Sequence, residues 1–84
     1  MINEKDGFDK IVEALEHQGF YIHKNYYIKY RHCRFIINFC KWAPPYLDVL
    51  LFMDEIGRNN ITKFKINRHG ILIQLNIKEV KIYD

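Results

Sequence analysis

The chain has 84 residues, of which 49% are hydrophobic and 15% aromatic, and its formal net charge is +3. This length and composition are typical of one small folded domain, spanning residues 1–84, and exclude a disordered tail. The sequence has no serine, which excludes a serine nucleophile, and its four glycines are too widely separated to form a phosphate-binding loop.

The first predicted element is an amphipathic helix over residues 5–18. Its large apolar residues recur at the helical period, at Phe8, Ile11, Val12 and Leu15. Gly19 suits the left-handed position that follows many helices, with Phe20 folding back onto the last turn. Because the apolar stripe is narrow, we expect this helix to pack on a broad apolar surface.

The remaining sequence alternates between apolar and polar residues, which is the pattern of strands. It predicts strands at about 20–24, 26–32, 34–42, 47–54, 61–67 and 71–83. Asn67-Arg68-His69-Gly70 has the residue types of a tight turn, so the last two strands are expected to form a hairpin. A shift of the apolar phase near Lys78-Glu79 indicates a bulge or bend in the final strand.

The segment 46–56 allows two interpretations. Its apolar residues alternate as in a strand, yet they also suit a buried helix that ends at Gly57, which would give the order α-β-β-α-β-β. We favour the strand because Asp54 and Glu55 would lie at the C-terminal end of such a helix, where the helix dipole disfavours negative charge.

These elements predict an α+β fold in which the N-terminal helix packs on a twisted antiparallel meander of four to six strands. The opposite face of the sheet is expected to be at least partly exposed. An exposed edge strand can pair with another copy of the chain, so a homodimer formed through a sheet edge is plausible. No internal repeat is evident in the sequence.

Positive charge is concentrated in the middle of the chain. Residues 1–16 have a net charge of −3, residues 17–47 have five bases and no acid, and residues 48–84 have a net charge of +1. Aromatic and basic residues alternate through 21–34, and tyrosines and cations on one strand face can stack bases and bind phosphates. The candidate binding residues are Lys24, Tyr27, Lys29, Arg31, Arg34 and Lys41.

Other kinds of site have weaker support. His23, His32, Cys33 and Cys40 lack the spacing of known zinc sites, so we expect no metal and no cofactor. Both cysteines fall in predicted strand interiors, where a thiol is poorly placed to act as a nucleophile. The carboxylates Asp48 and Asp54 would lie about 20 Å apart on one strand, too far for paired acid–base catalysis.

The sequence therefore predicts a small, non-enzymatic binding or regulatory module that contacts another protein and also itself. A weak nucleic-acid-binding protein that uses residues 21–41 is the alternative, and a small enzyme is a less favoured one. With two cysteines, no export signal at residue 1–6 and no long apolar run, we expect a cytoplasmic location and no membrane. The composition, rich in Ile, Lys, Asn and Tyr, resembles that of small proteins from AT-rich bacterial and phage genomes.

Overall fold

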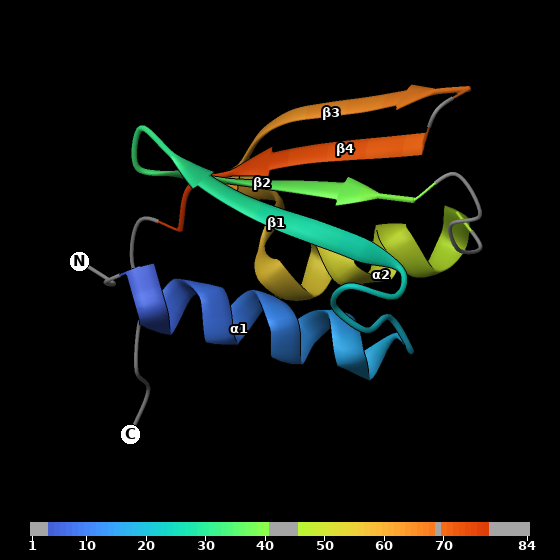
Figure 1. Ribbon diagram of the computed structural model, residues 1–84, viewed down its shortest axis with the longest axis horizontal. Helices are drawn as coiled ribbons and strands as arrows, with labels where there is room; N and C mark the ends of the chain where they lie inside the picture. The colour runs from blue at the N-terminus through green and yellow to red at the C-terminus, as the bar shows by residue number, and fades with distance from the viewer. Residues whose placement is uncertain (1–3, 41–45, 69, 78–84) are drawn as a thin grey trace.

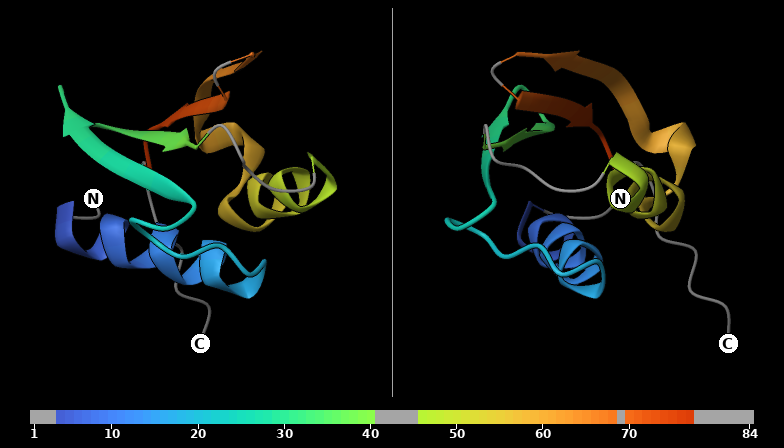
Figure 2. Two further views of the ribbon diagram at one scale, coloured as in Figure 1. Left: turned by 45° about the vertical axis from the view of Figure 1, so that its right-hand side comes forward. Right: turned by 90° about the vertical axis from the view of Figure 1, so that its right-hand side faces the viewer.

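The computed structural model describes residues 4–40, 46–68 and 70–77. Its elements are α1 (Glu4–His17), β1 (Tyr26–Arg31), β2 (Arg34–Phe39), α2 (Tyr46–Ile56), the 3₁₀ turn η1 (Arg58–Asn60), β3 (Ile61–Asn67) and β4 (Gly70–Leu75). The strands form one antiparallel sheet in the order β1-β2-β4-β3. Both helices lie on the same side of this sheet (Figures 1 and 2). The predicted α+β fold, with the N-terminal helix on the sheet, is confirmed.

The core lies between the helices and the sheet face that they cover. The two central strands supply alternate, buried side chains to it, namely Phe35, Ile37 and Phe39 of β2 and Ile73 and Leu75 of β4. Fully burying one such side chain contributes about 1.5–3 kcal/mol, so this layer supplies much of the stabilisation. All the buried residues that form the core are hydrophobic.

Helix α1 approaches the sheet through a glycine. A Cβ atom at Gly7 would lie 2.8 Å from ring carbons of Phe35, which is closer than atoms pack, so only glycine lets the helix sit at this distance from β2. Ile11 and Leu15 are fully buried, as the periodicity indicates, while Phe8 and Val12 are only half-buried. The contact face of α1 is therefore turned toward Gly7 and away from Phe8.

The end of α1 confirms the turn predicted at Gly19. Gly19 has a φ of 85°, and the backbone N–H groups of Gly19 and Phe20 donate to the carbonyls of Glu16 and Leu15 at 2.9 Å each. These two bonds are the Schellman arrangement, which satisfies carbonyls that the helix leaves open. Phe20 folds back into the core, where its ring packs edge-on against Phe39 at 5.6 Å.

The strand predicted at 47–54 is wrong, because residues 46–56 form helix α2. The buried residues follow the helical period, at Val49, Phe52, Met53 and Ile56. The unfavourable acids at the C-terminal end have partners: Arg58 Nε donates to Asp54 Oδ1 at 2.5 Å, and His17 Nδ1 lies 2.7 Å from Glu55 Oε2. Burial of the apolar residues and these two contacts offset the unfavourable interaction of the acids with the helix dipole.

The strand predicted at 20–24 is also wrong. Residues 21–25 form a turn in which the N–H groups of Lys24 and Asn25 donate to the carbonyl of Tyr21, and Ile22 makes only an isolated bridge to Tyr26. The last two strands form the predicted hairpin, but β2 ends at Phe39 and β4 at Leu75, before the predicted limits. Residues 41–42 and 78–83 of the predicted strands lie outside the described residues, and so does the bulge predicted near Lys78. Within the described residues, the pairing of β3 with β4 has a register shift between Ile61 and Lys63.

The fold contains a repeat that the sequence does not make evident. An α-β-β unit occurs twice, and its two hairpins have the same register, since Ile28 pairs with Ile37 and Phe64 pairs with Ile73, an offset of 36 residues in both strands. The strand order places the two units back to back, related by an approximate twofold rotation about an axis between β2 and β4. The repeat is therefore one of structure, and it becomes evident only from the element order and the strand register.

One core residue has an unusual polar group. Tyr26 is fully buried, its ring lies 5.9 Å from that of Phe39, and its hydroxyl has no hydrogen-bond partner among the described residues. Loss of hydration, with a smaller contribution from the Glu16 carboxylate, raises the pKa of Tyr26 from 10.0 to about 12. A buried polar group without a partner costs stability.

We predict that Tyr26→Phe raises the free energy of unfolding by about 1 kcal/mol, because it removes that uncompensated hydroxyl. In the wild type, the unfolded chain loses the tyrosine proton first, so stability falls as pH rises from 10 toward 12; the Phe variant lacks this component. Urea unfolding of both proteins, below pH 10 and between pH 10 and 12, measures the difference. An identical pH dependence in the two proteins would contradict the prediction.

Candidate nucleic-acid interface

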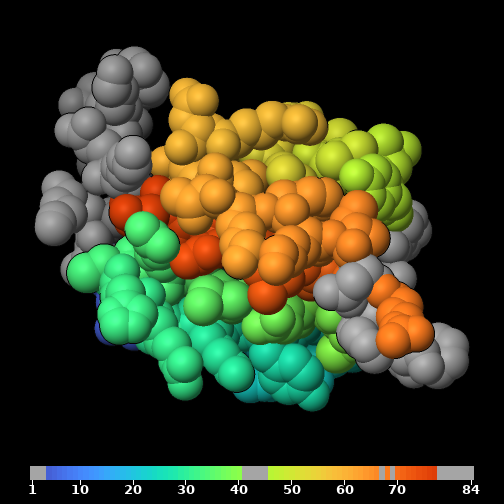
Figure 3. Space-filling view, turned by 90° about the horizontal axis from the view of Figure 1, so that it is seen from above, coloured from blue at the N-terminus to red at the C-terminus, as the bar shows by residue number. Residues whose placement is uncertain are grey.

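The sheet face opposite the helices is open. In Figures 1 and 2 neither α1 nor α2 covers this side, and Figure 3 views the molecule from this side. Because side chains alternate along a strand, the residues between the buried ones point to this side. We call it the outer face; its strand residues are Tyr27, Lys29, Arg31, Arg34, Ile36, Asn38, Lys63, Lys65, Leu72 and Gln74.

The strand register arranges these residues in rows across the sheet. One row contains Tyr27, Asn38, Leu72 and Lys65, and the next contains Lys29, Ile36, Gln74 and Lys63. Each row has an aliphatic and an amide side chain in the middle, and a lysine on β3. We call the four middle residues the central strip; they are Ile36, Asn38, Leu72 and Gln74. The outer strands β1 and β3 flank this strip about 14 Å apart, three times the usual strand spacing of about 4.8 Å.

The structure brings four of the six candidate residues together. Tyr27, Lys29 and Arg31 lie on β1 and Arg34 lies beside them on β2, all exposed and all on the outer face. Lys24 is exposed in the turn before β1 and is not part of the sheet. Lys41 lies outside the described residues.

Two cations of the outer face were missed by the sequence analysis. Lys63 and Lys65 extend the basic surface to the far edge of the sheet, on β3. Their alternation with Phe64 and Ile66 indicates that they share a face, but only the strand order shows that it is the face of Lys29.

Charge is separated between the two layers of the molecule. The helices α1 and α2 contain eight carboxylates and two lysines, a net charge of −6. The four strands contain five Lys or Arg residues and no Asp or Glu, a net charge of +5. A field of this form attracts an anionic partner to the sheet and repels it from the helices.

The hairpin between β1 and β2 has two features that cost stability. Arg31 and Arg34 are paired directly across the strands, and like charges in this arrangement are destabilising. The two-residue loop between them, His32-Cys33, has positive φ angles of 52° and 62°, which a type I′ turn needs and which glycine or asparagine adopts more easily. Backbone strain of this kind is found preferentially at functional sites.

Among the described strand residues, Tyr27 is the one aromatic residue of the outer face. Its side chain is 51% exposed. The His23 ring lies 6.1 Å from the Tyr27 ring at an interplanar angle of 61°, an edge-on contact that helps to hold the tyrosine in place. Tyr26 and Tyr30 alternate with Tyr27 and Lys29 along β1 and therefore lie on the inner face. There the Tyr30 ring packs against the Phe35 ring, with 4.7 Å between the ring centroids.

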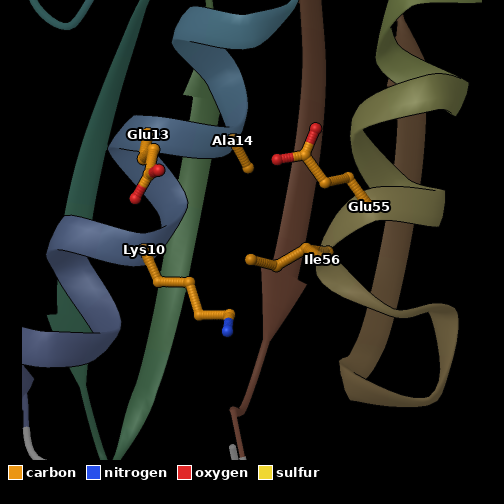
Figure 4. Close-up of a pocket in the computed structure, with 5 residues that line it drawn as sticks. All are labelled: Lys10, Glu13, Ala14, Glu55 and Ile56. Atoms are coloured by element: carbon orange, nitrogen blue, oxygen red, sulfur yellow. The ribbon is translucent and has the colours of Figure 1, made fainter. Parts of the chain in front are cut away.

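The helix layer contains a separate, small pocket. It has a volume of about 210 Å³ and lies between α1 and α2, with Lys10, Glu13 and Ala14 on one side and Glu55 and Ile56 on the other (Figure 4). His17 lies next to two of its acids, 2.7 Å from Glu55 and 3.9 Å from Glu13. These contacts tie the two helices together, and the opposed lysine and carboxylates give the pocket no strong charge preference.

The remaining candidate groups do not assemble into a reactive centre. No set of three or more His, Cys, Asp or Glu residues is placed to bind a metal within the described part of the chain. Both cysteines are free thiols. Cys33 is exposed in the turn after β1, whereas the sequence placed it in a strand interior, because the chain reverses direction at His32-Cys33.

Comparisons with known proteins leave this surface as the main guide to function. Within the described residues, neither helix has the length and apolar character that crossing a membrane requires. The chain matches no protein-family model, and neither curated proteins nor solved structures include a significant match to it.

Proposed function

We propose that the protein is a binding module that holds a nucleic acid against the outer face of its sheet. The observation that supports this most is the five cationic side chains on that face, with no carboxylate among the described strand residues. A surface of this kind neutralises phosphates and releases their counterions, which favours binding of polyanions.

The cost of the arrangement argues against a surface that is merely solvated. Strand faces that only need solubility mix both signs of charge, since opposite charges across strands are favourable and like charges are not. Here Arg31 faces Arg34, and the chain places its eight described helix carboxylates on the other layer. Repeating phosphates would relieve this repulsion, so we prefer nucleic acid to the protein contact expected from the sequence.

A second candidate function, self-association through the β3 edge, is favoured by a different observation. Leu47 and Leu51 share one side of α2 and are 64% and 45% exposed, and Ile66 on β3 is 53% exposed. Tyr46 of α2 packs edge-on against Phe64 of β3 at 6.3 Å, so the exposed part of the helix lies next to this edge strand. Edge strands present unpaired backbone groups to which a second copy can add.

The proposed function predicts that Lys63→Gln/Lys65→Gln weakens nucleic-acid binding. With about 0.7 counterions released per phosphate contact on a single strand, loss of both lysines should weaken binding about 25-fold at 0.1 M salt and reduce the slope of log affinity against log salt by about 1.4. Fluorescence anisotropy with a labelled oligonucleotide, measured over a salt series, gives both quantities.

The matched control removes the same charge from the opposite layer. Lys5→Gln/Lys10→Gln changes two exposed lysines of α1 and should leave the slope of the salt dependence unchanged. Equal effects of the two double variants would show that net charge alone governs binding, and an absence of binding at low salt would refute the proposed function.

We predict that Arg34→Glu has opposite effects on stability and on binding. It replaces a like-charge pair with Arg31 by an opposite-charge pair, which should raise the free energy of unfolding by about 0.5 kcal/mol. Nucleic-acid affinity should fall at least about fivefold at 0.1 M salt, because one phosphate contact is lost. Urea unfolding and anisotropy test the two parts, and a variant that gains stability without losing affinity would place Arg34 outside the interface.

The second candidate predicts that the wild-type protein sediments as a dimer at high concentration. The Leu47→Lys variant should sediment as a monomer at the same concentration, because the substitution places a charge in the apolar contact. Gln18→Lys, in the turn directly after α1, adds the same charge elsewhere and should have no such effect. A wild-type chain that sediments as a monomer at all concentrations would exclude self-association.

A further inference from the structure

We infer that the ligand of the outer face is a single-stranded nucleic acid, with its bases on the central strip and one base stacked on Tyr27. This inference rests on the proposed function and adds to it the form of the nucleic acid and the residue that recognises a base. It is carried by the side chains that lie between the cations.

The central strip is suited to bases and not to phosphates. Ile36 and Leu72 are half-buried aliphatic residues that lie diagonally to each other in the middle of the face, with Asn38 and Gln74 in the other two positions. Phosphates gain nothing from aliphatic side chains, whereas base faces pack on them and base edges hydrogen-bond to amides. A ligand that contacted only the lysines and arginines would leave the strip wet.

A duplex does not fit the same surface. It keeps its bases stacked in the helix and presents their edges only within grooves, of which the wider measures about 12 Å across and about 8.5 Å deep. The outer strands of the sheet are about 14 Å apart, and the side chains of the strip between them are half-buried and do not project far enough to enter a groove. Only an unpaired strand can turn its bases onto a flat sheet face.

Tyr27 is placed to stack a base beside a phosphate contact. Its half-exposed ring is braced by the His23 ring, so stacking needs little further ordering of the side chain. Lys29 follows two residues later on the same face, about 6.8 Å along the strand, which equals about two nucleotide steps of a stacked chain at about 3.4 Å each. A nucleotide stacked on Tyr27 therefore has a phosphate about two steps along its chain within reach of Lys29.

The test compares labelled single strands, as DNA and as RNA, with the duplex of the same sequence by fluorescence anisotropy at low salt. The single strands are expected to bind at least about tenfold more tightly than the duplex. Tyr27→Ala should weaken single-strand binding by about 5- to 150-fold without changing the salt dependence, because stacking and not charge is lost. Tyr27→Phe keeps the ring and should bind as the wild type does.

The matched control is Tyr21→Ala, since Tyr21 is also 51% exposed but lies in the turn before β1 and outside the sheet. Its affinity should equal that of the wild type. Duplex binding as tight as single-strand binding, or an unchanged affinity of Tyr27→Ala, would overturn this inference. The proposed function would still stand in that case if binding depended on Lys63 and Lys65. If no nucleic acid binds, both fail together.

Discussion

Packing of both helices on one face of the sheet is the constraint on which the other features of the molecule depend. It buries every second residue of each central strand, including the fully buried Ile37 and Ile73, and leaves the residues between them facing outward. The close approach of α1 at Gly7 makes this layer compact. Because the fully buried side chains lie on the inner side, the outer side of the sheet carries charge without weakening the core.

The separation of charge follows the same division into layers. The wet sides of the two helices carry the described carboxylates, and the wet side of the sheet carries lysines and arginines. Each layer satisfies the rule that an amphipathic element is polar on its exposed side. What that rule does not require is that each layer has one sign, or that Arg31 and Arg34 are neighbours. These departures from the favourable arrangement are the reason that we propose the sheet face, and not the helix pocket, as the binding surface.

Much of this architecture could be predicted from local patterns, and the failures have physical causes. The helix at 5–18 and the hairpin after Ile61 follow from periodicity and turn residues. The segment 46–56 fits both periods, and the choice depends on burial against α1 and the sheet, which no local pattern reports. The candidate cations of β1 and β2 were found from composition, whereas Lys63 and Lys65 join them only through the strand order.

The repeated α-β-β unit makes positions on the outer face equivalent in pairs. The pairs are Lys29 with Lys65, Ile36 with Leu72, and Asn38 with Gln74. Half a turn about the axis between β2 and β4 thus places cation on cation, aliphatic on aliphatic and amide on amide. Tyr27 and Arg34 break the correspondence, since Lys63 and Gly70 stand at the equivalent positions. A chain with distinct 5′ and 3′ ends would meet similar contacts in either direction, so its polarity on the sheet would be decided by the β1–β2 hairpin.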